Sequence, residues 1–268
     1  FASATFEGED FLGLGLKVWL ILAQTLGYMA SKFYGIKMIS ELKEQGRAWL
    51  IVGLISVSWL ALLGFALLPT PLNILCFVLN GFPLGLIWGI VFHYMEGRRF
   101  TEMMGSMLAA SFVFSSGIVK SVGTFLMQNW GIGEFWMPFT TGVLFFPLLL
   151  GGVFLLNHTP APSAEDIKMR SPRPPMDREG RKKLFREFRP GILLLILVYR
   201  MLTGLRDLRD NFVVEIWQSM NVEVAPQLLT QTEIPITLFL LVLMSCLVLI
   251  KSNKKAFFLN HWIILSGF

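Results

Sequence analysis

The stretch GILLLILVYRMLTGLRDLRDNF, residues 191–212, carries both signals that decide the fold of this protein. An unbroken apolar run reaches Tyr199, and Arg200 follows directly. Four more charged residues come soon after it, namely Arg206, Asp207, Arg209 and Asp210. A helix of about 20 apolar residues can cross a bilayer, whereas charged residues inside such a helix usually mark a function. The stretch therefore predicts a membrane helix that does more than anchor the chain.

The rest of the chain repeats the apolar part of this signal. Of its 268 residues 54% are hydrophobic, and the mean hydropathy is +0.62, which is more apolar than soluble domains are. We predict an all-α, polytopic transmembrane helical bundle with about seven full spans and part of an eighth, which begins near Ala256. The chain starts at Phe1 and stops inside an apolar run, so we expect a fragment of a longer protein. The predicted spans are 14–36, 49–68, 72–94, 103–126, 135–156, 191–212 and 234–250.

Basic residues alternate strictly between the predicted loops. Seventeen of the 23 lie in the first, third, fifth and seventh loops, and the second, fourth and sixth hold none. Cytoplasmic loops of membrane proteins are enriched in Lys and Arg. The odd loops are therefore predicted to be cytoplasmic, with Phe1, Glu223 and Glu233 on the outer side. The net charge of +5 is therefore explained by the placement of basic residues in cytoplasmic loops. We expect a lipid bilayer as a partner and no nucleic acid.

A long basic segment divides the predicted membrane part. Residues 1–156 would form an N-terminal half bundle that lacks its first helix, and residues 191–268 the truncated start of a C-terminal half. The cytoplasmic linker 157–190 begins rich in Pro and ends DREGRKKLFREF, where apolar residues share a helical face among basic ones. That pattern is typical of a helix lying on an anionic membrane surface, although a solvated linker remains an alternative.

Three glycines, Gly81, Gly85 and Gly89, follow one another at intervals of four in NGFPLGLIWG. Small residues at this spacing lie on one helix face and let a neighbouring backbone approach closely. Pro83 adds a possible kink. The motif predicts a close helix pair, which would serve either static packing or gating.

Local motifs then suggest a family. SKFYGIKMISELKEQGR, residues 31–47, resembles the conserved loop between the second and third helices of the major facilitator superfamily, with Gly35, Glu41, Gly46 and Arg47 matching its skeleton. LNGFPLGLIWG is similar to the organophosphate:phosphate antiporter branch. TQTEIP and RDNFVVEIW look like recurring strings of an uncharacterised bacterial family of facilitator-like proteins. The resemblance implies transport across a bacterial inner (cytoplasmic) membrane and a gating role for Glu41 and Arg47.

Polar side chains inside the spans are the candidate substrate site. Lys17 and Gln24 share a face of the first span, and Lys120 shares one with Ser116 and Thr124. Interfacial anchoring of either lysine is the alternative. Arg206 is four residues before Asp210 and is predicted to pair with it, in a salt-bridge or gating network with Asp207 and Arg209 at the outer mouth.

Arg200 lies deeper than that network and has no acid within one turn. In the antiporters an arginine of the seventh helix binds substrate phosphate, and the resemblance places Arg200 on the equivalent helix. The planar guanidinium suits phosphate and carboxylate because it donates two hydrogen bonds at once. An ion pair with an acid of another helix is the alternative.

Signatures of enzymes are missing: the sequence has no HExxH, GxSxG or phosphate-binding glycine loop. We expect no enzyme activity, no cofactor and no metal site. The expected function is secondary active transport of a small organic anion, such as a phosphate ester, by alternating access, with Lys17, Gln24, Lys120 and Arg200 binding the substrate. The alternative is a membrane sensor or scaffold of the same fold that does not transport. The coupling ion stays open.

Overall fold

The computed structural model describes residues 1–40, 46–95, 98, 101–160, 163–169, 178–248, 250 and 252–266. Helices account for nearly all regular structure there, apart from a two-stranded hairpin in which Asp10 pairs with Gly15. The elements in chain order are β1 (Asp10–Phe11), β2 (Leu14–Gly15), α1 (Leu16–Ser40), α2 (Arg47–Leu67), α3 (Leu72–Met95), α4 (Thr101–Trp130), α5 (Met137–Asn157), α6 (Ala164–Met169), α7 (Arg178–Asn211), α8 (Val213–Ser219), α9 (Pro226–Val248) and α10 (Asn253–Ser266).

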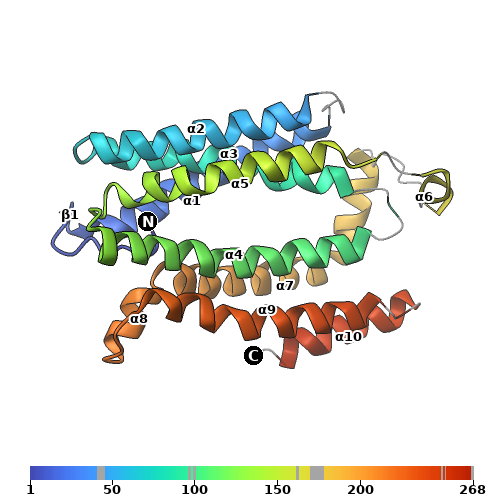
Figure 1. The fold of residues 1–268 in the computed structure, drawn as a ribbon. Coiled ribbons are helices and arrows are strands. Elements are labelled where there is room, and N and C mark those ends of the chain that lie inside the picture. Colours follow the sequence, from blue (N-terminus) through green and yellow to red (C-terminus); the bar gives the residue numbers. More distant parts are fainter. Residues whose placement is uncertain are drawn as a thin grey trace.

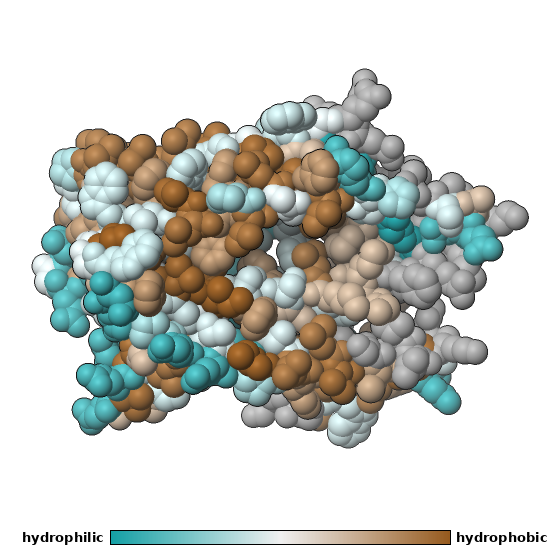
Figure 2. All heavy atoms as spheres, in the orientation of Figure 1, coloured by the Kyte–Doolittle hydropathy of each residue, from teal (hydrophilic) through white to brown (hydrophobic). Residues whose placement is uncertain are grey.

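Six of these helices are long and apolar enough to cross a membrane, namely α2, α3, α4, α5, α7 and α9. Figure 2 shows apolar side chains gathered over the middle of the helices and hydrophilic ones mostly at the two ends. The chain is therefore an integral, multi-pass membrane protein with an all-α fold. The predicted first span corresponds to α1, which is 25 residues long but carries Lys17, Gln24 and Lys32 and is not among the six.

Two predicted boundaries were wrong. α9 begins at Pro226, eight residues before the predicted span, so Glu233 lies inside the helix instead of before it. α7 begins at Arg178, because the basic part of the linker is helical and continues into the span. The backbone leaves helical geometry at Phe188 (φ −109°, ψ 15°), two residues before Pro190. Figure 1 shows the part of α7 before this kink crossing the end of the bundle, as a helix lying on a membrane surface would.

Successive long helices run in alternate directions across the bundle (Figure 1). The hairpin, the α4–α5 connection and α8 gather at one end of the bundle, which we call the outer end. The helix ends that flank the basic loops gather at the other. This arrangement is the one that the alternation of basic residues predicts.

Helices α1, α2, α3 and α5 form the first group, with α3 packed between α1 and α2. A polar chain crosses this group: Gln24 Nε2 donates to Asn80 Oδ1 (2.8 Å), and Asn80 Nδ2 donates to the Ser58 hydroxyl (2.8 Å). Buried polar groups in a membrane need such partners because no water is available to replace them. Gln24 therefore joins α1 to α3.

The predicted close helix pair is confirmed between α3 and α1. A Cβ atom added at Gly81 would lie 3.0 Å from the carbonyl carbon of Gln24, and one at Gly27 would lie 2.9 Å from that of Val78. These neighbours are backbone atoms, which cannot move aside as a flexible side chain can. The two helices therefore meet backbone to backbone.

Gly81→Ala is expected to destabilise the protein by about 3 kcal/mol, the upper range for inserting a methyl group into a packed interior. Unfolding of the purified protein in detergent micelles would measure the loss. Gly53→Ala on α2 is the control, since a Cβ there meets nothing within 4 Å. Equal stabilities of the two variants would contradict the close approach of α1 and α3.

Candidate functional site

Charged side chains from five helices meet near the outer end of the bundle. The first pair joins Lys17 of α1 to Glu215 of α8. Lys17 is only 4% exposed, its ammonium group also donates to the carbonyl of Ala2 (3.2 Å), and it lies 5.3 Å from the centre of the Phe212 ring. An ammonium group so far from water needs this set of partners, because a buried charge without them is costly.

The second part of the cluster is a chain of four residues. Lys120 of α4 pairs with Asp210 of α7 (Nζ to Oδ1, 3.2 Å). Asp210 Oδ1 also lies 3.6 Å from Nη2 of Arg209, which in turn donates to Oε1 of Glu233 on α9 (2.7 Å). Lys120 and Glu233 are buried, and Arg209 is about half exposed. This chain of ion pairs therefore links α4, α7 and α9.

We call these six residues the outer ion-pair network: Lys17, Lys120, Arg209, Asp210, Glu215 and Glu233. Three basic groups face three acidic groups, so the network is neutral. Both lysines come from helices before the basic linker, and all three acids come from helices after it. The network thus joins the two parts of the chain.

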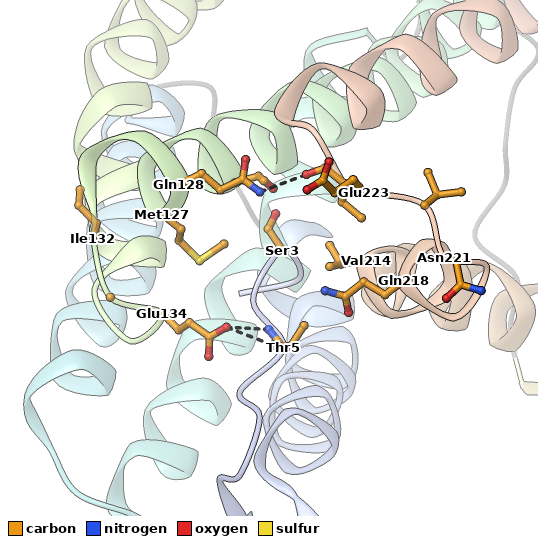
Figure 3. Close-up of a pocket in the computed structure, with 14 residues that line it drawn as sticks. Ser3, Thr5, Met127, Gln128, Ile132, Glu134, Val214, Gln218, Asn221 and Glu223 are labelled. Carbon is orange, nitrogen blue, oxygen red and sulfur yellow. Dashed lines mark hydrogen bonds between the residues drawn. The ribbon is translucent and has the colours of Figure 1, made fainter.

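A polar pocket of about 620 Å³ lies at the outer end above the network. Figure 3 shows Gln128 on one side of it and Gln218 and Asn221 on the other, with Ser3 and Thr5 between them. Glu134 is part of the lining, and its carboxylate accepts hydrogen bonds from the backbone N–H groups of Thr5 (3.0 Å) and Phe6 (2.9 Å). The charged residues of its lining are Glu134 and Glu223, with no Lys or Arg among the described residues.

The four residues predicted to bind substrate do not form one surface. Lys17 and Lys120 are buried and paired with acids, and Gln24 is bonded to Asn80 away from them. Arg200 is exposed on α7, ten residues before Asp210, which is about 15 Å along a helix. Among the described residues no ion pair is found for Arg200.

The predicted pair of Arg206 with Asp210 is not what the structure contains. Arg206 Nη2 instead pairs with the neighbouring Asp207 (2.8 Å), and both side chains are well exposed. Asp210 faces α4, where it forms an ion pair with Lys120. A buried lysine from another helix has therefore replaced the local partner.

Arg47, another predicted gating residue, lies at the opposite end of the bundle. Arg47, the first residue of α2, is buried and lies 5.7 Å from the ring centre of Tyr94 on α3. Glu41 lies outside the described residues. Within the described part of the chain no group of three or more His, Cys, Asp or Glu could hold a metal ion.

Sequence reasoning missed two acids of the network, Glu215 and Glu233. Both lie close to apolar runs, in RDNFVVEIW and TQTEIP. These strings indicated only a family resemblance, Glu233 was predicted on the outer side, and neither acid was given a partner. An acid beside an apolar run would have been a signal, since charged residues at membrane depth usually face protein or a wet cavity.

A family model matches residues 1–268, the whole chain, and its description is "Family of unknown function (DUF5690)". The chain belongs to this family. Searches among curated proteins and among solved structures found no match. The function of this DUF5690 protein must therefore be inferred from its own residues.

Proposed function

We propose that this DUF5690 protein is a secondary active transporter of a small organic anion, working by alternating access in a facilitator-type fold. The observation that carries the proposal is the outer ion-pair network, which joins α1 and α4 to α7, α8 and α9. In alternating access one bundle rocks against the other around a central site. The network would then be the outer gate, closed in this structure.

The charges of the network suit such a gate. Asp210 and Glu215 are each 31% exposed, and Arg209 is 48% exposed, so water can solvate these groups when the pairs separate. Leaving a buried charge without its partner costs about 3–5 kcal/mol, so the pairs can separate only if water or an anion replaces the carboxylates beside the buried Lys17 and Lys120. Opening the network would also free Lys17 and Lys120, which could then attract an anion.

Arg200 supplies the reason to propose an anionic substrate. A charged residue at the centre of a bilayer costs about 2.5–3.5 kcal/mol even on the mildest scale. Arg200 lies within the apolar part of α7 with no ion pair found among the described residues, so an anion would lower that cost. A phosphate ester fits the paired donors of its guanidinium. The proposed location is a bacterial inner membrane.

Reconstitution into lipid vesicles tests the function. We expect labelled inorganic phosphate, a sugar phosphate or a dicarboxylate to enter vesicles that contain the full-length protein, at a rate above that of protein-free vesicles. Binding of one of these anions without any flux would instead favour a sensor or scaffold. Absence of both would contradict the proposal.

A further inference from the structure

Glu233 stands out among the acids of the network because of its burial. Its side chain is 9% exposed, whereas the side chains of Asp210 and Glu215 are 31% exposed. It lies on the face of α9 that packs against α4, opposite Gly117, where an added Cβ would lie 2.9 Å from its Cγ. The neighbouring contact between Ser121 and Thr230 (2.6 Å) holds the same two helices together. The carboxyl group is therefore enclosed between two closely packed membrane helices.

The two oxygens of Glu233 differ in their surroundings. Oε1 accepts the hydrogen bond from Arg209, whereas Oε2 is buried and has no hydrogen-bond partner. The hydroxyl of Thr237, one turn further along α9 on the same face, is also buried without a partner. The charged groups around Glu233 are Arg209 and Asp210 on α7 and Lys120 on α4. Arg209 is the one of these that contacts the carboxylate.

A buried acceptor without a donor is destabilising, and more so if it is charged. Oε2 could regain a bond by accepting a donor or by taking up a proton, which turns the carboxylate into a group that also donates. The close packing at Gly117 favours the smallest of these ligands. We propose that Glu233 is a proton-binding site and that its proton drives the transport proposed above, on which this inference rests.

Proton binding would change the charge of the whole network. With Glu233 ionised, three positive groups face three negative groups; with Glu233 protonated, three face two. The excess positive charge would fall on Arg209, which keeps only the longer contact to Asp210 (3.6 Å). Protonation therefore weakens the tie between α7 and α9 and leaves one positive charge for an anion to balance. The proton and the anion are expected to bind together and to move in the same direction.

Infrared spectroscopy of the purified full-length protein tests the proton site without any transport. As the pH is lowered, the parent should gain a carbonyl-stretch band of a protonated acid in an environment of low polarity. Glu233→Gln should lose that band. Glu223→Gln, at an exposed glutamate of the outer pocket, should keep it. A parent without such a band, or a Glu233→Gln protein that keeps it, would overturn the proposal.

Two further measurements make the outcome decisive. If Glu233→Gln does not fold, Glu233→Asp retains a carboxyl group, and the band should shift in position; an unshifted band would overturn the proposal. An imposed proton gradient should increase uptake of labelled phosphate or sugar phosphate by parent vesicles, and Glu233→Gln should lose that increase. The infrared band without any anion flux would leave the proton site established and the transport function refuted.

Discussion

Asp210→Asn will destabilise the protein by about 3 kcal/mol, because it leaves the ammonium group of Lys120 buried without its carboxylate. The two groups are 3.2 Å apart, and Lys120 is enclosed while Asp210 is partly solvated. Removing Lys120 instead should cost less, since Asp210 keeps Arg209 and access to water. Equilibrium unfolding in detergent micelles would compare the free energies of unfolding of the two variants.

The double variant Lys120→Met with Asp210→Asn should recover most of the loss, because neither a buried charge nor its partner remains. A double-mutant cycle measures this coupling directly. Losses that simply add in the double variant would show that Lys120 and Asp210 do not interact.

Arg206→Gln is the matched control for this cycle. Arg206 lies on the same helix as Asp210, but it pairs with Asp207 in an exposed position. Exposed ion pairs contribute about 0–1 kcal/mol, so the free energy of unfolding should change little. If Arg206→Gln rescued Asp210→Asn, the result would support the Arg206–Asp210 pair that helix spacing predicts and would contradict the structure.

The comparison of these two pairs shows how far sequence reasoning could reach. Helix spacing identifies neighbours on one helix, and it correctly placed charged residues at the outer end of α7. It could not show that Asp210 faces α4, because Lys120 is 90 residues away in the chain. Lys17 was likewise interpreted as a substrate-binding residue or an interfacial anchor, because its partner Glu215 is 198 residues away in the chain.

The fold was easier to predict from the sequence than the site, because bilayer thickness fixes the length of apolar runs. The predicted spans therefore agree with α2, α3, α4 and α5 to within a few residues. The prediction failed where polar residues belong to a membrane helix. α9 opens with the polar stretch PQLLTQTE, which looks like a loop in isolation but packs against α4 in the structure. The sequence therefore shows Glu233 as an acid beside an apolar run, but it does not show that this acid is buried against α4.

Arg200→Gln is expected to weaken binding of an anionic ligand about 100-fold, as the loss of one partner in a desolvated charge pair does. Arg200→Lys keeps the charge but loses the two parallel donors, so about a 10-fold loss is expected. Titration calorimetry with inorganic phosphate, a sugar phosphate and a dicarboxylate would measure the dissociation constants of purified full-length protein.

The control separates substrate binding from damage to α7. Arg206→Gln removes the same side chain six residues further along the same helix, where Asp207 already neutralises it, and it should leave the dissociation constants unchanged. All three variants should unfold with free energies close to that of the parent, because Arg200 is exposed and its loss leaves no cavity. If Arg200→Lys binds every active anion as tightly as the parent, the guanidinium does not hold the substrate. Arg200 would then belong to an ion pair with another part of the protein, and the proposal of an anionic substrate would lose its main support.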